Sequence, residues 1–97
     1  MNTYYIGQKV RCSVEFTVNA VLTDPATVTF KYRTPDGGTT TTNVYGAPGS
    51  IVMKDSVGAY HADFTPTANG EWLLRWEGTG ACEAVEEDSL LIYTQFR

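Results

Sequence analysis

No stretch of this 97-residue chain approaches the ~18 uninterrupted apolar residues of a membrane-spanning helix. Its first residues, MNTY, lack the basic start and apolar run of a secretory signal peptide, so the sequence predicts none. Charged residues make up only 19% of the chain and hydrophobic residues 42%, which is typical of a folded protein and excludes a disordered one. The length predicts a single domain over residues 1–97.

Basic residues are also few. Seven lysines and arginines stand against eleven aspartates and glutamates, for a net charge of −4. This balance argues against a nucleic-acid-binding protein, which needs a cationic face. The charge is uneven, because residues 1–48 carry four bases and three acids (+1), whereas residues 49–97 carry three bases and eight acids (−5).

Cysteine and histidine are scarcer still. Cys12 and Cys82 are too few for a disulfide scaffold, and no CxxC occurs, so we expect two free thiols and no zinc knuckle. His61 is the single histidine, with Asp63 on the same side of its strand, and no GxSxG elbow accompanies it. The acids of residues 83–88 do not fit an EF-hand loop, and GTG at 78–80 is too short for a phosphate loop. We therefore expect no catalytic residue, no metal and no cofactor.

What the sequence does contain is alternation of period two. In residues 9–18 every even position is apolar and every odd position is polar, which predicts a strand with one buried face. The same reasoning, with turn signals between the runs, predicts seven strands at 9–18, 27–33, 39–45, 51–54, 60–64, 71–77 and 89–93. A short helical turn over 81–88 is an alternative for the segment before the last strand. Residues 39–45 are polar on both faces and predict an exposed edge strand.

The pattern predicts an all-β, seven-stranded Ig-like or fibronectin-like β-sandwich of two antiparallel sheets. The predicted core consists of the residues that share inward parity: Val10, Cys12, Val14, Phe16, Val28, Phe30, Tyr60, Phe64, Trp72, Leu74 and Trp76. Because Leu90, Leu91 and Ile92 are consecutive, the faces of the last strand cannot be assigned. Trp72 and Trp76 are expected between the sheets rather than on an exposed platform.

The motif Asp55-x-x-Gly58-x-Tyr60 resembles the penultimate-strand region of immunoglobulin-like and filamin-like domains. There the tyrosine ring is buried and its hydroxyl bonds backbone near the turn. A wider resemblance, to small phage- and prophage-encoded Ig-like proteins, covers nearly the whole chain. It rests on turn and core residues, namely YIGQKV at 5–10, DPATV at 24–28, RTPDG at 33–37, GAYHA at 58–62 and RWEGTGA at 75–81.

This resemblance implies a non-enzymatic virion component at the head surface, the neck or the tail. Such a protein would be made in the host cytoplasm and would dock onto capsid or tail proteins in multiple copies, as a homo-oligomer or an array, without binding nucleic acid or membrane. The family supplies no catalytic residues. The alternative from a different class is a carbohydrate- or cell-surface-binding Ig-like adhesion module, which an exposed aromatic platform would favour.

Charged side chains give the candidate partner contacts. If 9–18 and 27–33 pair as neighbours, with Val10 opposite Tyr32, their bases stack as like charges on the outer face, which suggests a contact with something acidic. The acids near the C-terminus form either a solvated loop or a surface for a basic neighbour. The predicted partner-contact residues are Lys9, Arg11, Lys31, Arg33, Glu83, Glu86, Glu87 and Asp88.

Overall fold

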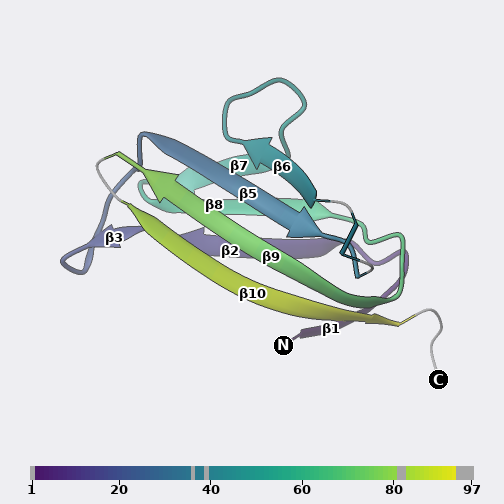
Figure 1. Cartoon of the computed structure of the whole chain (residues 1–97). Helices are drawn as coiled ribbons and strands as arrows, with labels where there is room; N and C mark the ends of the chain where they lie inside the picture. Colours follow the sequence, from purple (N-terminus) through teal and green to yellow (C-terminus); the bar gives the residue numbers. More distant parts are fainter. Residues whose placement is uncertain (1, 36, 39, 81–82, 94–97) are drawn as a thin grey trace.

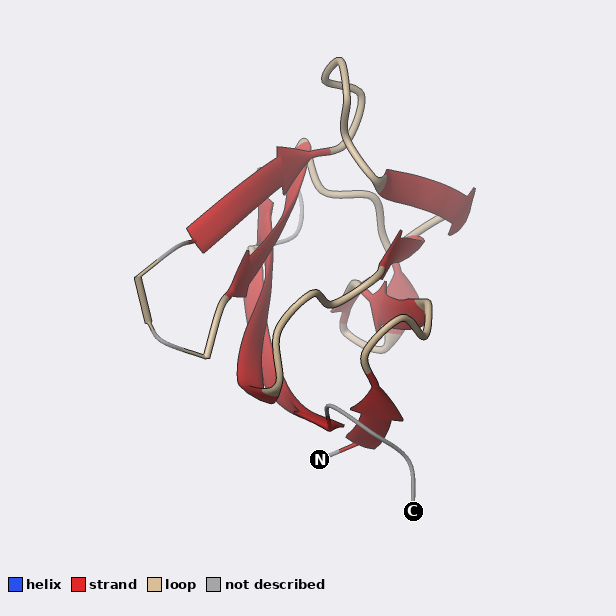
Figure 2. Ribbon diagram, turned by 90° about the vertical axis from the view of Figure 1, so that its right-hand side faces the viewer, coloured by secondary structure: helices blue, strands red, loops and turns tan. Residues whose placement is uncertain are grey.

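The computed structural model describes residues 2–35, 37–38, 40–80 and 83–93, and every regular element in them is a strand (Figures 1 and 2). The ten strands are β1 (Asn2–Tyr5), β2 (Val10–Glu15), β3 (Thr17–Val18), β4 (Val21–Leu22), β5 (Thr27–Arg33), β6 (Thr40–Val44), β7 (Val52–Ser56), β8 (Ala59–Phe64), β9 (Gly70–Thr79) and β10 (Ala84–Tyr93). Over these residues, no helix has the length and apolar character needed to cross a membrane.

The strands form a five-stranded sheet of order β1-β10-β9-β5-β6, a three-stranded sheet of order β2-β8-β7, and the hairpin β3-β4. The all-β, sandwich-like prediction is therefore confirmed, but seven strands in two sheets is wrong. Not all of the pairing is antiparallel either, because β1 runs parallel to β10 along Leu90–Tyr93. β6 lies at a sheet edge, as its polar sequence predicts.

The two larger sheets bury one core between them. All eleven predicted core residues are buried, and Val52, Ala62, Leu90 and Ile92 join them. Aromatic rings connect the layers: Phe64 of β8 stacks on Tyr32 of β5 at 4.6 Å between centroids and lies 5.8 Å from Trp72 of β9. Burial follows parity because alternate side chains of a strand point to opposite faces.

Two turns depend on residues whose backbone has a positive φ. The predicted strand 9–18 divides into β2 and β3, and β3 forms a hairpin with β4, which lies between the predicted strands 9–18 and 27–33. The hairpin turn places Asn19 at φ 52° and Ala20 at φ 66°. Positive φ at both central residues is the geometry of a two-residue hairpin turn. At the end of β7, Gly58 has φ 73°, and a Cβ there would lie 2.8 Å from the Phe16 carbonyl oxygen, so this position requires glycine.

The segment before the last predicted strand is itself strand. β10 begins at Ala84 and pairs with β9 from Ala84–Gly78 to Ile92–Gly70, so a helical turn over 84–88 is wrong. Leu90 and Ile92 face the core and Leu91 is half-buried on the other face. The backbone ladder with β9 satisfies this segment's hydrogen bonds as a strand, which a short helix would do only marginally.

The pairing of 9–18 with 27–33, considered as one arrangement that would stack the bases, does not form. β2 pairs with β8, with Val10 opposite Phe64, whereas β5 lies in the other sheet between β9 and β6. The chain crosses from one layer to the other between β4 and β5. Parity correctly places both strands' apolar residues in the core, but it does not specify which strand is the neighbour.

Candidate functional site

The structure divides the four predicted basic contact residues between the two sheets. Lys9 and Arg11 belong to the region of β2, whereas Lys31 and Arg33 belong to β5 in the five-stranded sheet. The expected stack of Lys9 on Arg33 and of Arg11 on Lys31 therefore does not form. Arg33 instead donates from Nε and Nη2 to the Gly37 carbonyl oxygen, which ties it to its own turn.

Arg11 is part of a charged network on the outer face of the three-stranded sheet. Its Nε and Nη2 donate to the two Asp63 carboxylate oxygens at 2.9 and 3.0 Å, and this hydrogen bonding lowers the pKa of Asp63. His61 lies between two carboxylates, with Nδ1 2.7 Å from Asp55 Oδ1 and Nε2 3.9 Å from Asp63 Oδ2. Asp55 is a partner that sequence reasoning missed, because it assigned Asp55 to the turn rather than to β7.

A second network crosses the outer face of the five-stranded sheet. Lys31 lies directly opposite Arg75, and both contact Glu77, with Lys31 Nζ at 3.2 Å and Arg75 Nε at 2.6 Å. Arg75 also donates to Glu87 of β10 at 2.8 Å. Hydrogen bonds from Arg75 and then Lys31 lower the pKa of Glu77. One carboxylate between two cations relieves a like-charge pair on adjacent strands.

The acidic contact residues divide by parity along β10. Glu87 points to the outer face, toward Arg75, whereas Glu86 and Asp88 stand on the side of Leu90, which faces the core. They are nevertheless exposed, because among the described residues β1 pairs with β10 only along Leu90–Tyr93 and β2 is the edge of its own sheet. The flank of the sandwich between β2 and the first half of β10 is thus left open.

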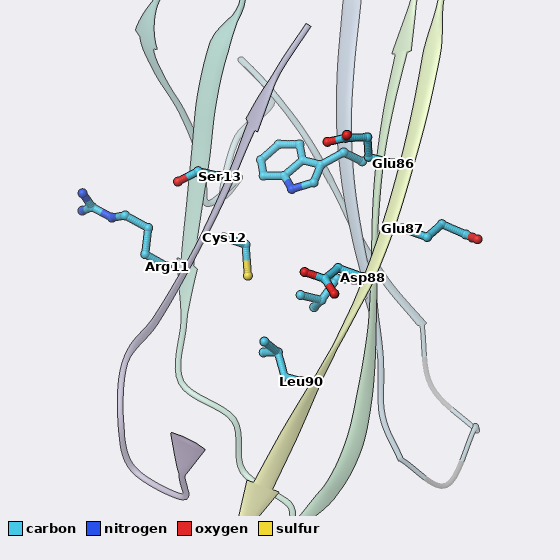
Figure 3. Close-up of a pocket in the computed structure, with 9 residues that line it drawn as sticks. Arg11, Cys12, Ser13, Glu86, Glu87, Asp88 and Leu90 are labelled. Carbon is cyan, nitrogen blue, oxygen red and sulfur yellow. The ribbon is translucent and has the colours of Figure 1, made fainter. Parts of the chain in front are cut away.

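This open flank forms a groove of about 290 Å³, here called the β2–β10 groove. Figure 3 shows Cys12 and Asp88 pointing into it, and Arg11 and Glu87 pointing away on opposite sides. Its lining residues are Arg11, Cys12, Ser13, Leu74, Trp76, Glu86, Glu87, Asp88 and Leu90. The groove therefore combines an apolar floor with a carboxylate rim.

Cys12 forms part of the floor. Burial raises the pKa of its thiol to about 12, and the negative charges of Asp88 and then Asp63 add to the rise. The thiol is free, as predicted. The protonated, nearly buried thiol is a weak nucleophile, so it acts as a small core residue. Cys82 lies outside the described residues.

Asp24 organises the crossing from β4 to β5. Its carboxylate accepts hydrogen bonds from Lys54 Nζ at 2.7 Å, Gly58 N–H at 2.8 Å and the Tyr60 hydroxyl at 3.0 Å. The bonds from Lys54 and then Gly58 lower the pKa of Asp24, while burial and then Asp24 raise the pKa of Tyr60 to about 12. Tyr60 thus bonds a carboxylate rather than the predicted backbone group.

The remaining chemistry of the described residues is limited. They contain no group of three or more His, Cys, Asp and Glu side chains placed to hold a metal ion. An aromatic pair lies at the end of β1, where the rings of Tyr5 and Tyr93 are 5.9 Å apart at 42°, and both residues are exposed. Trp72 and Trp76 are buried, so they do not form an exposed platform.

Comparisons with known proteins extend this description only to the fold. Neither the protein-family models nor the curated protein sequences match this chain. A crystal structure from Bacteroides vulgatus ATCC 8482, which carries a provisional glycoside hydrolase assignment, is similar over 100% of this chain with a TM-score of 0.64 and 11% identity. This chain spans 17% of the length of that protein. At this identity the similarity concerns the fold alone.

Proposed function

We propose that this protein is a non-enzymatic structural or accessory component of a phage particle, which docks onto capsid or tail proteins in multiple copies. The observation that best supports a docking role is the set of open strand edges. Within the residues that the structure describes, β2 and β6 each end a sheet, and from Ala84 to Ser89 no strand pairs with β10 on the side away from β9. Open edges are surfaces on which another chain adds a strand. The assignment to a phage particle rests on the resemblance to phage-encoded proteins.

Strand order supports the finer, Ig-like assignment. β2, β8 and β7 correspond in chain order to strands B, E and D of that fold, and β10, β9 and β5 to strands G, F and C. β6 and β1 then extend the second sheet at its two edges. The non-enzymatic part of the proposal rests on His61, which is held between two carboxylates with its ring mostly covered by neighbouring groups.

Particles provide the test of a virion role. Purified particles made with and without this gene should be compared by electron cryomicroscopy and mass spectrometry, with a known capsid protein as the internal standard. We expect the protein in stoichiometric, symmetric density on the head, neck or tail, made in the host cytoplasm and incorporated during assembly. Its absence from purified particles would refute the proposal.

A carbohydrate- or cell-surface-binding module is the second candidate. The exposed Tyr5–Tyr93 pair favours it, because sugars stack on exposed aromatic rings. The fold similarity to one part of a provisionally assigned glycoside hydrolase also favours it. A glycan array with the wild-type protein, the Tyr5→Ala/Tyr93→Ala variant and a Tyr45→Ala control tests it. Glycan binding lost only in the double variant would support this role.

A further inference from the structure

We propose that β2 is a self-association edge, on which β2 of a second copy pairs antiparallel about a two-fold axis. In the register that we infer, Arg11 of each copy lies opposite Glu15 of the other. The result is a continuous six-stranded sheet built from two three-stranded sheets. This inference does not depend on the proposed phage role, because it concerns only how the chain meets a copy of itself.

The other open edges are less suited to a new strand. β7 has an irregular register between Lys54 and Ser56, which is a bulge at the opposite edge of the same sheet. β1 has only four residues and β6 is polar on both faces. The uncovered half of β10 carries the inward-pointing carboxylates of Glu86 and Asp88. Bulges, short strands and inward charges all oppose edge pairing.

β2 has none of these features. Its six residues pair with β8 in one uninterrupted register, and Val10, Cys12 and Val14 fix its inner face in the core. Within the described part of the chain, no strand covers its outer edge. Sheets with one buried face specify register strongly, so a strand added to β2 would meet a rigid, preformed template.

The direction of the free backbone groups follows from the ladder with β8. Phe16 N–H donates to the Gly58 carbonyl oxygen at 2.7 Å, and this pair continues the β2–β8 register one residue beyond Glu15 opposite Ala59. Hydrogen-bonded pairs recur at every second residue of an antiparallel ladder. The even residues of β2 therefore bond β8, and the N–H and C=O groups of Arg11, Ser13 and Glu15 point to the open edge.

A two-fold axis at Ser13 uses these three residues fully. It places Ser13 opposite Ser13 of the second copy, and Arg11 opposite Glu15 of the second copy on both sides of the axis. All three residues are exposed on the outer face. Opposite charges directly across two strands stabilise the pairing, and the symmetry provides this contact twice.

Both charged side chains that this register needs are exposed. Glu15 has no hydrogen bond or ion pair with any described residue. The Arg11 side chain is 63% exposed and bonds Asp63 through Nε and Nη2, which leaves Nη1 available. Glu86 and Asp88 of both copies would lie on the same flank, in the other layer, and their like charge keeps the association weak and reversible.

Charge reversal tests the register. Sedimentation velocity over a concentration series should show a monomer–dimer equilibrium for the wild type. Glu15→Arg should weaken the dimer by about tenfold or more, because two like-charge pairs replace two attractive ones. Arg11→Glu/Glu15→Arg should restore most of the affinity. Circular dichroism checks that each variant is folded, which matters for the double variant because it loses the Arg11–Asp63 pair.

Cross-linking tests the axis independently. Ser13→Cys should form a disulfide-linked dimer under mild oxidation, because directly opposed, hydrogen-bonded residues have Cα atoms ~5.5 Å apart, within disulfide range. Met53→Cys, an exposed site on β7 at the other edge of the same sheet, is the matched control and should stay monomeric. A wild type that remains monomeric, a double variant that is not rescued, or equal cross-linking at both cysteines would each overturn the proposal.

Discussion

The two halves of β10 both lie beside β9, but only the second half also pairs with β1. Along Leu90–Ile92 the strand pairs with β9 on one side and β1 on the other, and Leu90 and Ile92 are 2% and 1% exposed. From Ala84 to Ser89, β9 is the one paired strand in the described part of the chain, and Glu86 and Asp88 occupy core-facing positions. Parity alone therefore does not decide burial; the covering strand does.

The two halves of β10 also differ in what their side chains contribute, namely the stability of the fold in one half and contacts with partners in the other. Opposite Leu90 lies Trp72, which is part of the aromatic core, whereas opposite Glu86 lies Trp76, which lines the β2–β10 groove. Carboxylates at core-facing positions do not stabilise the core, but they keep an open flank soluble and oppose uncontrolled strand pairing. We expect substitutions in the covered half to affect folding and substitutions in the open half to affect association.

The largest expected effect lies in the covered half. Trp72→Ala should cost ~3–5 kcal/mol of the free energy of unfolding, because the ring is buried between the sheets and leaves a cavity. That loss is close to the whole stability of a small domain. Denaturant unfolding followed by circular dichroism measures it. A variant with the wild-type midpoint would show that the sheets do not depend on this side chain.

A matched pair two residues apart tests the comparison directly. Leu90→Ala should cost ~2–4 kcal/mol through lost burial and a cavity, whereas Asp88→Ala should change the free energy of unfolding by no more than ~0.5 kcal/mol. Both side chains stand on the same side of the same strand. Equal losses in denaturant unfolding would mean that the open half is covered in solution.

The pH dependence of stability tests the hydrogen bonds that the Asp24 carboxylate accepts. Because hydrogen bonding lowers the pKa of Asp24 in the folded state, its contribution is complete above the unfolded pKa of ~3.9 and is lost as pH falls through the folded value. Asp24→Asn should therefore be less stable than the wild type at neutral pH and lose less stability on acidification. Glu86→Gln, which removes no hydrogen bond to a described residue, is the control for the loss of a carboxylate and should have the wild-type stability at neutral pH. Thermal unfolding at stepped pH measures both slopes, and parallel slopes for Asp24→Asn and the wild type would contradict the assignment.

The sequence predicts the buried faces well, because alternation is a local property that each strand carries by itself. It does not predict strand neighbours: Val10 and Tyr32 both face the core, yet they lie in different sheets. The β3-β4 hairpin escapes notice because its turn is Asn19-Ala20 rather than the asparagine–glycine pair typical of such turns.

The candidate site is less predictable for a related reason. The acids of residues 86–88 resemble a solvated loop in the sequence, since Ala84 is the only apolar residue on the inner face of β10 between Ala84 and Ser89. The groove lies where, among the described residues, β10 is not paired with β1 and β2 is a sheet edge, and both are relations between distant segments. The same holds for Asp24, whose three donors lie more than 29 residues away along the chain.

The smallest expected effect concerns Cys12, which reports on the open half from inside the groove. Its raised pKa of about 12 predicts slow alkylation at pH 8, because only the thiolate reacts. Asp88→Asn removes one negative charge that raises this pKa, so the thiolate fraction and the rate should increase. The increase should be less than about tenfold, because burial, the larger cause, remains.

Glu87→Gln is the matched control, since Glu87 points to the opposite face. Mass spectrometry of the Cys12 peptide over time measures the rates, and equal acceleration in both variants would show that Asp88 exerts no specific field on the groove.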